Sequence, residues 1–384
     1  MRDEDGSVAV ETAEQPPTGE ANGQPVVRAE GVWKVFGSHG ERIIGTPDAD
    51  LSRAELREKT GNVVAVRDVS LEIFPGEVFV VMGLSGSGKS TLVRTLIRLI
   101  EPSAGAITIT GQDVMAADSG ELRQLRRHTV SMVFQHFGLL AHRRVIDNVA
   151  FGLEIQGMDK RERLARAEDV LRLVGLEDAA NQFPDQLSGG MQQRVGLARA
   201  FAVDPKLMLY DEPFSALDPL IRRDMQDEVI RLQEETEKTM LFITHDLPEA
   251  LRIGDRIAIM RDGAIVQLGT PEELVGSPAD HYVANFVRDI PRTHVLTLRW
   301  IMRAPRPGED MDGPKLDVGT TVQDAVPVVA ATDGTVRAIE NGRTVGVVDR
   351  ETVLHAMAET PEAHPKEAVG VHPAEPGVSA HGSS

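Results

Sequence analysis

The segment Gly83-Leu-Ser-Gly-Ser-Gly-Lys-Ser90 matches the pattern G-x-x-x-x-G-K-[ST]. It follows an apolar run, Val78–Met82, that is typical of a strand, and it precedes a run, Thr91–Ile100, that is typical of a helix. Glycines let the backbone curl so that its N–H groups and the N-terminus of the next helix face a phosphate group. This order predicts an α/β fold in which the loop binds nucleotide phosphates. The alternative, a Gly- and Ser-rich turn that binds nothing, is disfavoured by the strand and helix on either side.

The side chains of this loop have separate predicted tasks. Lys89 is expected to reach the β- and γ-phosphates, and the Ser90 hydroxyl is expected to bind Mg²⁺. The other predicted nucleotide contacts come from the same loop and the first helical residue, namely Gly83, Ser85, Gly86, Ser87, Gly88 and Thr91. A nucleoside triphosphate with Mg²⁺ is therefore the expected ligand, and this loop alone fits many NTPases, including nucleoside kinases, GTPases and DNA motors.

Composition limits the classes of protein that this chain can represent. Its 384 residues are enough for one large domain and a smaller one. The 59 acidic and 41 basic residues give a formal net charge of -18, which argues against DNA or RNA as the main partner. Because the chain has no cysteine, it can have no disulfide, no thiolate zinc site and no cysteine nucleophile.

Neither a secretory signal nor a membrane span is expected. The N-terminus Met1-Arg-Asp-Glu-Asp5 is acidic, whereas a secretory signal has a basic start and an apolar run. No apolar stretch approaches the roughly 18 residues that a spanning helix needs. We therefore expect the protein to stay inside the cell and to reach a membrane only by docking on other subunits.

Strand-like runs recur along the chain with helical patterns between many of them, which predicts a sheet with helices on its faces. The earliest run, through Phe74, is more typical of an antiparallel strand pair. Between Asn148 and Gln186 two helical patterns, the second at Lys160–Val174, indicate a helical insert. The strand-like runs are Val63–Ile73, Val78–Met82, Ala106–Thr110, Val130–Phe134, Leu207–Tyr210, Met240–Thr244 and Ile257–Met260.

Composition also predicts the domain boundaries. Acidic and proline-containing ends predict a disordered leader and tail, and a Pro-, Gly- and Asp-rich stretch after about Thr293 predicts a linker. The predicted order is leader 1–25, main domain 26–292 with its helical part at about 136–190, linker 293–319, small module 320–358 and tail 359–384.

A second loop, Leu187-Ser-Gly-Gly-Met-Gln-Gln-Arg194, begins a helix that Ser188 is placed to cap. Small residues before a helix N-terminus leave its N–H groups free for a phosphate, so Ser188, Gly189 and Gly190 are predicted nucleotide contacts. Alone, the same residues also fit an ordinary capped helix. The loop resembles the signature sequence of ABC ATPases, which kinases and GTPases lack.

The order of further motifs resembles the ABC ATPase domain from about Val26 to Pro291. In that family a glutamine, here Gln135, senses the γ-phosphate through metal and water. Lys206-Leu-Met-Leu-Tyr-Asp-Glu-Pro213 resembles the Walker B strand, which implies that Asp211 holds the Mg²⁺ shell. The resemblance also implies that Glu212 activates the attacking water as general base.

Three further positions take roles from the same resemblance. Ser215-Ala-Leu-Asp218 resembles the loop that crosses between subunits, so Asp218 is a predicted nucleotide-site residue. His245, in Ile243-Thr-His-Asp246, occupies the position of the family's γ-phosphate switch. Phe36 aligns best with the aromatic residue that stacks on adenine, and Trp33 is the competing choice.

The family implies an active site shared between two chains, with ATP held between the phosphate loop of one and the signature loop of the other. We therefore expect a head-to-tail homodimer whose closure does mechanical work. It is expected to dock on transmembrane permease subunits near Gln135–Arg144, at the cytoplasmic face of the plasma membrane. An extracytoplasmic substrate-binding protein is an indirect partner, and nucleic acid is not expected.

Within the ABC group the chain is most similar to ATPases of glycine betaine/proline importers. Those proteins share an insert after the adenine aromatic, here Gly40–Asn62, whose helix-like part ends in the C-cap glycine Gly61. Further matches are Met82–Gly86, Phe134–Leu140, Met191 and Ser215–Arg222. Alternatives are the ATPase of another importer, such as one for amino acids, a soluble ABC ATPase without a membrane partner, and a regulatory nucleotide-binding protein.

Members of that subfamily usually carry two CBS modules after the ATPase domain, and this chain has one weak match. Val326–Val329 and Arg343–Arg350 resemble its strands, and Val353-Leu354 its closing helix. The fold expected is thus a P-loop ABC ATPase domain with an antiparallel β subdomain and a helical insert, followed by a small α+β CBS-like module. That module is expected either to regulate transport by ionic strength or to be a remnant that stabilises the dimer.

Overall fold

The computed structural model describes residues 23–134, 138–215, 217–309 and 311–358. The predicted tail and most of the predicted leader lie outside the described residues. No helix in the described ranges is both long and apolar enough to cross a membrane.

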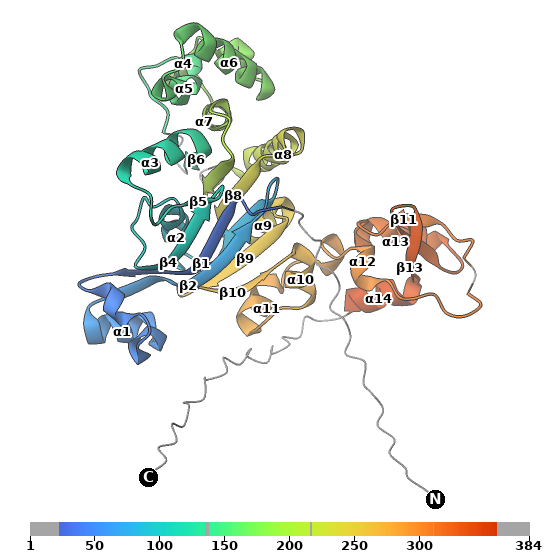
Figure 1. Ribbon diagram of the computed structural model, residues 1–384. Helices are drawn as coiled ribbons and strands as arrows, with labels where there is room; N and C mark the ends of the chain where they lie inside the picture. The colour runs from blue at the N-terminus through green and yellow to red at the C-terminus, as the bar shows by residue number, and fades with distance from the viewer. Residues whose placement is uncertain (1–22, 135–137, 216, 310, 359–384) are drawn as a thin grey trace, which may run out of the picture.

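A six-stranded sheet forms the centre of the molecule, in the order β10-β9-β3-β8-β7-β6 (Figure 1). The strands are β10 (Ala264–Gly269), β9 (Arg256–Arg261), β3 (Val78–Met82), β8 (Thr239–Thr244), β7 (Leu207–Asp211) and β6 (Val130–Phe134). All are parallel except the edge strand β10. The described side chains of β3, β7 and β8 are buried throughout, as strands covered on both faces require.

A second, four-stranded sheet is antiparallel and has the order β2-β1-β4-β5. It consists of β1 (Val27–Phe36), β2 (Val63–Ile73), β4 (Ala104–Ile109) and β5 (Gln112–Asp113). The predicted antiparallel pair is confirmed, since β1 pairs with β2 from Val27 opposite Ile73 to Phe36 opposite Val63. The helix α2 (Lys89–Leu96) packs in one apolar cluster with strands of both sheets through Leu92, Val93 and Leu96.

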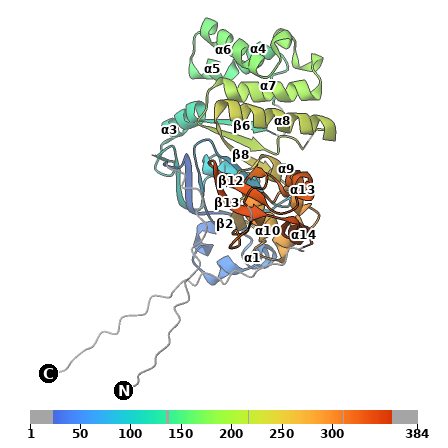
Figure 2. The ribbon, with the colours of Figure 1, turned by 90° about the vertical axis from the view of Figure 1, so that its right-hand side faces the viewer.

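Helices form a layer beyond the other face of the central sheet and gather at the end of the molecule opposite α1 (Figures 1 and 2). They are α4 (Val145–Val149), α5 (Phe151–Gln156), α6 (Lys160–Leu173), α7 (Gly189–Ala202) and α8 (Pro219–Thr236). In the chain, α3 (Ser119–Gln124) precedes these helices and α9 (Leu247–Ile253) follows them. The predicted helix at Lys160–Val174 is confirmed as α6.

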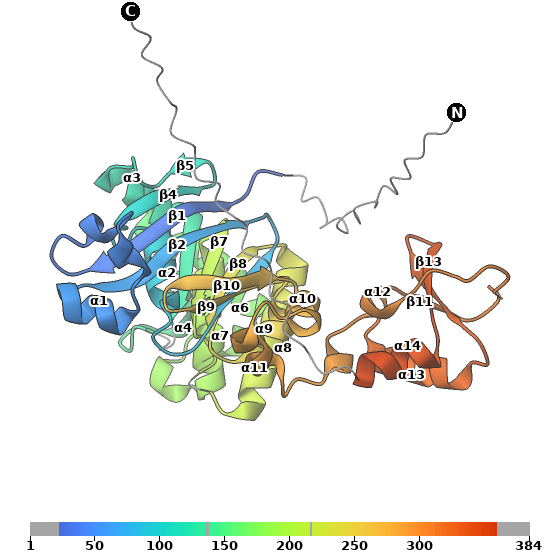
Figure 3. The ribbon, with the colours of Figure 1, turned by 90° about the horizontal axis from the view of Figure 1, so that it is seen from below.

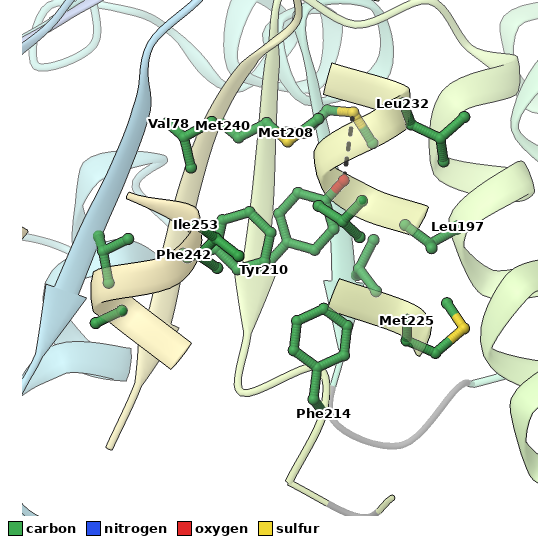
Figure 4. Close-up of a cluster of buried hydrophobic side chains, with 14 of the residues drawn as sticks. Val78, Leu197, Met208, Tyr210, Phe214, Met225, Leu232, Met240, Phe242 and Ile253 are labelled. Atoms are coloured by element: carbon green, nitrogen blue, oxygen red, sulfur yellow. Dashed lines mark hydrogen bonds between the residues drawn. The ribbon is translucent and has the colours of Figure 1, made fainter. Parts of the chain in front are cut away.

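The core between this layer and the sheet holds β7 in place (Figure 4). Tyr210 is fully buried, and its ring stacks on Phe242 of β8 with centroids 4.0 Å apart. Leu197 of α7 and Leu232 of α8 complete the same cluster. Two acidic residues directly after Tyr210 are thereby fixed at the end of a rigid strand.

The Gly40–Asn62 insert folds into two short 3-10 helices, η1 (Gly40–Ile43) and η2 (Pro47–Asp50), and the helix α1 (Arg53–Thr60). Ser52 caps α1 in a capping box with Glu55. The predicted C-cap is confirmed, because Gly61 adopts the left-handed conformation with φ 72°.

After α10 (Pro271–Gly276) and α11 (His281–Val287), a separate unit lies to one side of the main domain (Figure 3). Its elements are η6 (Arg292–His294), α12 (Leu298–Ile301), β11 (Lys315–Asp317), α13 (Val322–Ala331), β12 (Val336–Glu340), β13 (Arg343–Val348) and α14 (Arg350–Ala358). We call residues 292–358 the C-terminal unit. Its three strands form one sheet in the order β11-β12-β13.

Two expectations for this region are wrong. The predicted linker 293–319 contains η6, α12 and β11, and its Leu296 and Leu298 are completely buried. Val326–Val329, predicted as a strand, lies in α13. The buried residues Val322, Ala325 and Val329 recur with a helical rather than a strand period, and this burial outweighs the strand preference of valine.

Candidate nucleotide site

The phosphate loop connects β3 to α2 with a backbone that only glycine permits at two positions. A side chain at Gly83 would place its Cβ 2.3 Å from the Met260 carbonyl oxygen, and one at Gly88 would be 2.2 Å from that of Ala65. Both glycines also have positive φ, 152° and 110°. The crest of the loop, including Ser85 and Gly86, is exposed, whereas Ser87 is buried.

Lys89, the first residue of α2, is buried under the loop with its ammonium facing backbone carbonyls. Its Nζ donates to the carbonyl oxygens of Gly83, at 2.7 Å, and Leu84, at 3.1 Å. Burial lowers the pKa of Lys89, and the nearby charges of Glu212 and Asp211 oppose that shift. A cation enclosed by a loop of this shape can bind phosphate oxygens.

The Walker B residue Asp211 meets Ser90 from across the sheet. The Ser90 hydroxyl donates to Asp211 Oδ1 at 2.9 Å, so the two predicted metal ligands are brought together. Mg²⁺ is typically held by one or two protein oxygens together with substrate phosphates and waters, and this pair of oxygen donors fits it. The third predicted ligand, Gln135, lies outside the described residues.

The sequence prediction missed Arg94. Its Nη2 lies 3.1 Å from Asp211 Oδ2, so Asp211 is held by both a hydroxyl and a guanidinium. Arg94 follows Ser90 by one helical turn, a spacing that puts both side chains on one face of α2. The spacing could have indicated that Arg94 joins Ser90 in contacting Asp211, but only once β7 was known to lie beside this face of α2.

Glu212 and His245 form the other half of the site, at the ends of β7 and β8. His245 Nδ1 lies 3.1 Å from Glu212 Oε2, so these predicted residues are in hydrogen-bond contact. Glu212 has a positive φ of 48°, a conformation that is uncommon for a side chain of this kind. Its N–H donates to the Ile243 carbonyl oxygen at 3.0 Å, and the Ser215 hydroxyl donates to its carbonyl oxygen at 2.9 Å, which stabilises the turn.

A small pocket beside Glu212 and His245 contains a further carboxyl group that the sequence did not indicate. Glu249 of α9 is buried, and its Oε1 has no hydrogen-bond partner within the described part of the chain. Burial, with the nearby charge of Asp246, raises the pKa of Glu249 to about 7. In the same pocket Arg222 pairs with Asp246 at 3.3 Å.

The signature loop presents its small residues to solvent. Ser188 accepts a hydrogen bond from the Met191 N–H at 3.3 Å and so caps α7, as expected, while Ser188 and Gly189 are exposed. Gln193, buried on the same helix, donates to the Pro213 carbonyl oxygen at 2.9 Å and ties α7 to the turn after Glu212. Asp218 caps α8 through the Leu220 and Ile221 N–H groups.

Across the described ranges, no hydrogen bond joins the signature loop, residues 187–190, to the phosphate loop of the same chain. The two aromatic candidates differ in exposure. The Phe36 side chain is 42% exposed at the end of β1, whereas Trp33 packs against the apolar cluster of the insert. Lys34 Nζ lies 4.9 Å from the Phe36 ring centroid.

Together these residues form a P-loop nucleotide site with a metal-ligand pair, a cation for phosphate, and a carboxylate–imidazole pair that can orient water. Fold and site thus define an ATP-hydrolysing enzyme of the P-loop class. The family model described as ABC transporter matches residues 66–215.

The chain is similar to transport ATP-binding proteins over most of its length. The Bacillus subtilis glycine betaine transport ATP-binding protein OpuAA is 51% identical over 290 residues, covering 76% of this chain and 69% of that protein. The trimethylamine N-oxide transport system ATP-binding protein TmoW of Ruegeria pomeroyi is 47% identical over 336 residues, covering 87% and 98%. A solved structure, the ADP- and phosphate-bound dimer of the ATP-binding cassette MJ0796, has 32% identity, a TM-score of 0.53, and coverage of 64% of this chain and 98% of its own.

The chain belongs to the ATP-binding subunits of ABC transporters, and its ATPase activity is coupled to transport. The predicted ABC ATPase fold is confirmed. The CBS-like assignment of the C-terminal unit stays a prediction.

Proposed function

We propose that this subunit energises an importer of small methylated amines of the glycine betaine and proline betaine type. The observation that carries the proposal is 51% identity to the glycine betaine subunit of Bacillus subtilis and 52% to the glycine betaine/proline betaine subunit of Escherichia coli. The folded Gly40–Asn62 insert supports it. Sulfate/thiosulfate subunits are less similar, at 43% identity or below.

Trimethylamine N-oxide is a second candidate cargo. The match covers 69% of the Bacillus subtilis relative but 98% of the Ruegeria pomeroyi trimethylamine N-oxide relative. The whole chain length, including the C-terminal unit, is thus closer to the latter. Glycine betaine and trimethylamine N-oxide each carry three methyl groups on a positively charged nitrogen, so a binding protein could recognise either by the same chemistry.

In the proposed mechanism the phosphate loop and Lys89 bind the phosphates of ATP, and Ser90 and Asp211 would hold Mg²⁺, which would neutralise phosphate charge. Glu212 accepts a proton from the attacking water, and His245 orients Glu212 and the γ-phosphate. Gln135, which lies outside the described residues, would be a further metal ligand by the family resemblance. The Phe36 ring, exposed at the end of β1, stacks on adenine.

We further propose a head-to-tail homodimer with two ATP molecules at its interface. The exposure of Ser188 and Gly189 supports this, because a helix N-terminus with free N–H groups can meet the γ-phosphate bound to a second copy. The Asp218 loop lies beside the same interface. Hydrolysis would then reopen the dimer and reset the transporter.

The permease surface is proposed at the groove between α4, α5 and α6. Its lining is largely basic and includes His142, Arg143, Arg144, Lys160 and Arg163, with Asp147 and Glu154. His142, Arg143 and Arg144, at the end of the predicted docking segment, line this groove, which supports the proposal. The chain would act at the cytoplasmic face of the membrane, with the substrate-binding protein on the far side.

The cargo is tested by deleting the gene in its own organism and measuring uptake of radiolabelled glycine betaine, proline betaine and trimethylamine N-oxide, with sulfate as the unrelated solute. We expect uptake of at least one methylated amine to be lost. The wild-type chain should restore this uptake, and the Glu212→Gln variant should not. Unchanged uptake of all three amines would contradict the proposal.

The C-terminal unit is proposed as a CBS-like module that adjusts transport to ionic strength. Its β11-α13-β12-β13-α14 order supports this assignment. Deletion should begin at Arg292, because a cut after Pro305 would remove Thr320 and Val322, to which the buried residues Leu298 and Leu296 are hydrogen-bonded through the backbone. Salt activation of transport that survives this deletion would leave the unit as a structural remnant.

A further inference from the structure

The side chain of Arg53, on the insert helix α1, is hydrogen-bonded to the phosphate loop. Its Nη1 donates to the carbonyl oxygen of Gly86, and its Nη2 lies 3.3 Å from the carbonyl oxygens of both Ser87 and Ala65. Gly86 and Ser87 belong to the loop, whereas Ala65 belongs to β2. One guanidinium therefore joins three backbone carbonyls on two separate segments.

The backbone segments around this guanidinium lie too close to one another to leave room for side chains at Gly88 and Gly263. A Cβ on Gly88 would lie 2.2 Å from the Ala65 carbonyl oxygen, and a Cβ on Gly263, in the turn between β9 and β10, would lie 2.9 Å from it and 3.3 Å from Arg53 Nη2. The Gly263 N–H also donates to the Ser87 carbonyl oxygen at 2.9 Å. Carbonyls crowded together in this way need a donor, and the planar fork of an arginine supplies several from one position.

The insert is itself firmly held, so it can transmit position to the loop. Leu56 of α1 is completely buried, and the Ser52 capping box fixes the start of the helix directly before Arg53. Arg67 of β2 donates to the Leu51 carbonyl oxygen at 2.8 Å, and Lys59 pairs with Asp48 at 2.6 Å. Arg53 thus projects from a fixed element.

The consequence for nucleotide binding follows from peptide geometry. A peptide group is planar, so holding the Ser87 carbonyl also fixes the direction of the Gly88 N–H, and holding the Gly86 carbonyl fixes that of the Ser87 N–H. A loop rich in glycine otherwise loses much conformational entropy when it closes on phosphate. A charged donor on the carbonyl side also polarises the peptide group, which strengthens its N–H as a donor.

We propose that Arg53 is a positioning residue for ATP, and that the Gly40–Asn62 insert serves as a brace that holds the phosphate loop ready for the nucleotide. The inference rests on the proposed role of the loop as the phosphate site. It assigns the insert a task inside the ATPase domain, separate from cargo and from the C-terminal unit.

The test measures the Kd for Mg-ATP of the purified full-length chain by calorimetric titration, alongside the melting temperature of the nucleotide-free protein. We expect Arg53→Ala to weaken ATP binding about tenfold, because a small misplacement of groups that hold a ligand has large effects. Arg53→Lys, which keeps the charge but loses the fork, should recover part of that loss. Arg57→Ala, an exposed arginine on the same helix, is the matched control and should bind ATP like the wild type.

Each outcome decides the matter. Wild-type ATP affinity in Arg53→Ala would overturn the inference, and so would an equal loss in Arg57→Ala, which would point to general charge effects. A loss of affinity that appears only together with a large fall in the melting temperature, with no recovery in Arg53→Lys, would also overturn it. Lys89→Ala is the reference: if that variant binds ATP normally, the loop assignment itself fails, and a failure of Arg53 alone leaves the assignment standing.

Discussion

The nucleotide site and the C-terminal unit both contain charged side chains at low exposure, yet those charges are arranged in opposite ways. In the C-terminal unit Arg303 pairs with Glu309 at 2.6 Å and with Asp349 at 2.7 Å, so positive and negative groups satisfy each other. In the nucleotide site the Lys89 ammonium donates to two carbonyl oxygens, and Oε1 of buried Glu249 has no hydrogen-bond partner among the described residues.

This difference separates a stabilising cluster from a working site. Charged groups that pair with each other stabilise the fold and have little hydrogen-bonding capacity left for a ligand. Charged groups without full partners destabilise the fold and can bind a ligand. The comparison yields four predictions, from loss of turnover at one end to a modest change in stability at the other.

The largest effect is expected from Glu212→Gln. The amide cannot accept the proton of the attacking water, so ATP turnover should fall by about two to four orders of magnitude. ATP binding should persist, and the variant should accumulate as a closed dimer, seen by size-exclusion chromatography with ATP. Exposed Glu234→Gln on α8 serves as control. Wild-type turnover in Glu212→Gln would show that Glu212 is not the general base.

The second prediction concerns the shared site. Ser188→Arg places a bulky cation where a second copy would present its γ-phosphate, so turnover should fall about tenfold or more. ATP binding by the isolated chain should be unchanged, because within the described residues no hydrogen bond joins the signature loop to the phosphate loop of the same chain. Asp185→Arg, which introduces the same residue at an exposed position just before the loop, is the control. Normal turnover in Ser188→Arg would argue against the head-to-tail arrangement.

The third prediction uses the pH dependence of Glu249. Its folded pKa of about 7 lies above the ordinary value of 4.5, so the folded chain binds more protons than the unfolded chain between these limits. Wild-type stability should therefore fall as the pH rises from about 4.5 to 7, with the full penalty above that.

Glu249→Gln removes that penalty. It should stabilise the chain by on the order of 3 kcal/mol at pH 8 and by little at pH 5, measured by urea unfolding. Glu234→Gln should show neither change. A Glu249→Gln variant no more stable than the wild type at pH 8 would mean that the buried carboxyl carries no penalty.

The smallest effect is expected from Arg303→Met, which should lower the urea midpoint of the C-terminal unit without changing ATP turnover. The hydrogen bond from Arg303 lowers the pKa of Glu309 to about 2, so this contribution is present above pH 4.5 and is lost as the pH falls toward 2. The difference from wild type should shrink over that range. Arg299→Met, from a more exposed pair with Glu340, should have less effect, and equal effects would contradict the special position of Arg303.

Much of the fold was predictable because its signals are local. The central strands are short and apolar along their length, and all seven predicted strand regions coincide with strands of the two sheets. The C-terminal unit was predicted less well. Leu296 and Leu298 are two apolar residues next to a Pro-rich stretch, and only the partners that bury them reveal that they are core.

The sequence by itself determined the loop chemistry of this protein. Gly83–Ser90, the signature loop and the acidic pair at the end of β7 each depend on residues that are adjacent in the chain, so their motifs are visible without a fold. Only the tertiary structure decided which side chains act together. Arg94 beside Asp211, Glu249 beside Glu212 and His245, and Arg53 of the insert beside Gly86 each bring together segments that are distant in sequence. Such contacts depend on packing that no local pattern encodes.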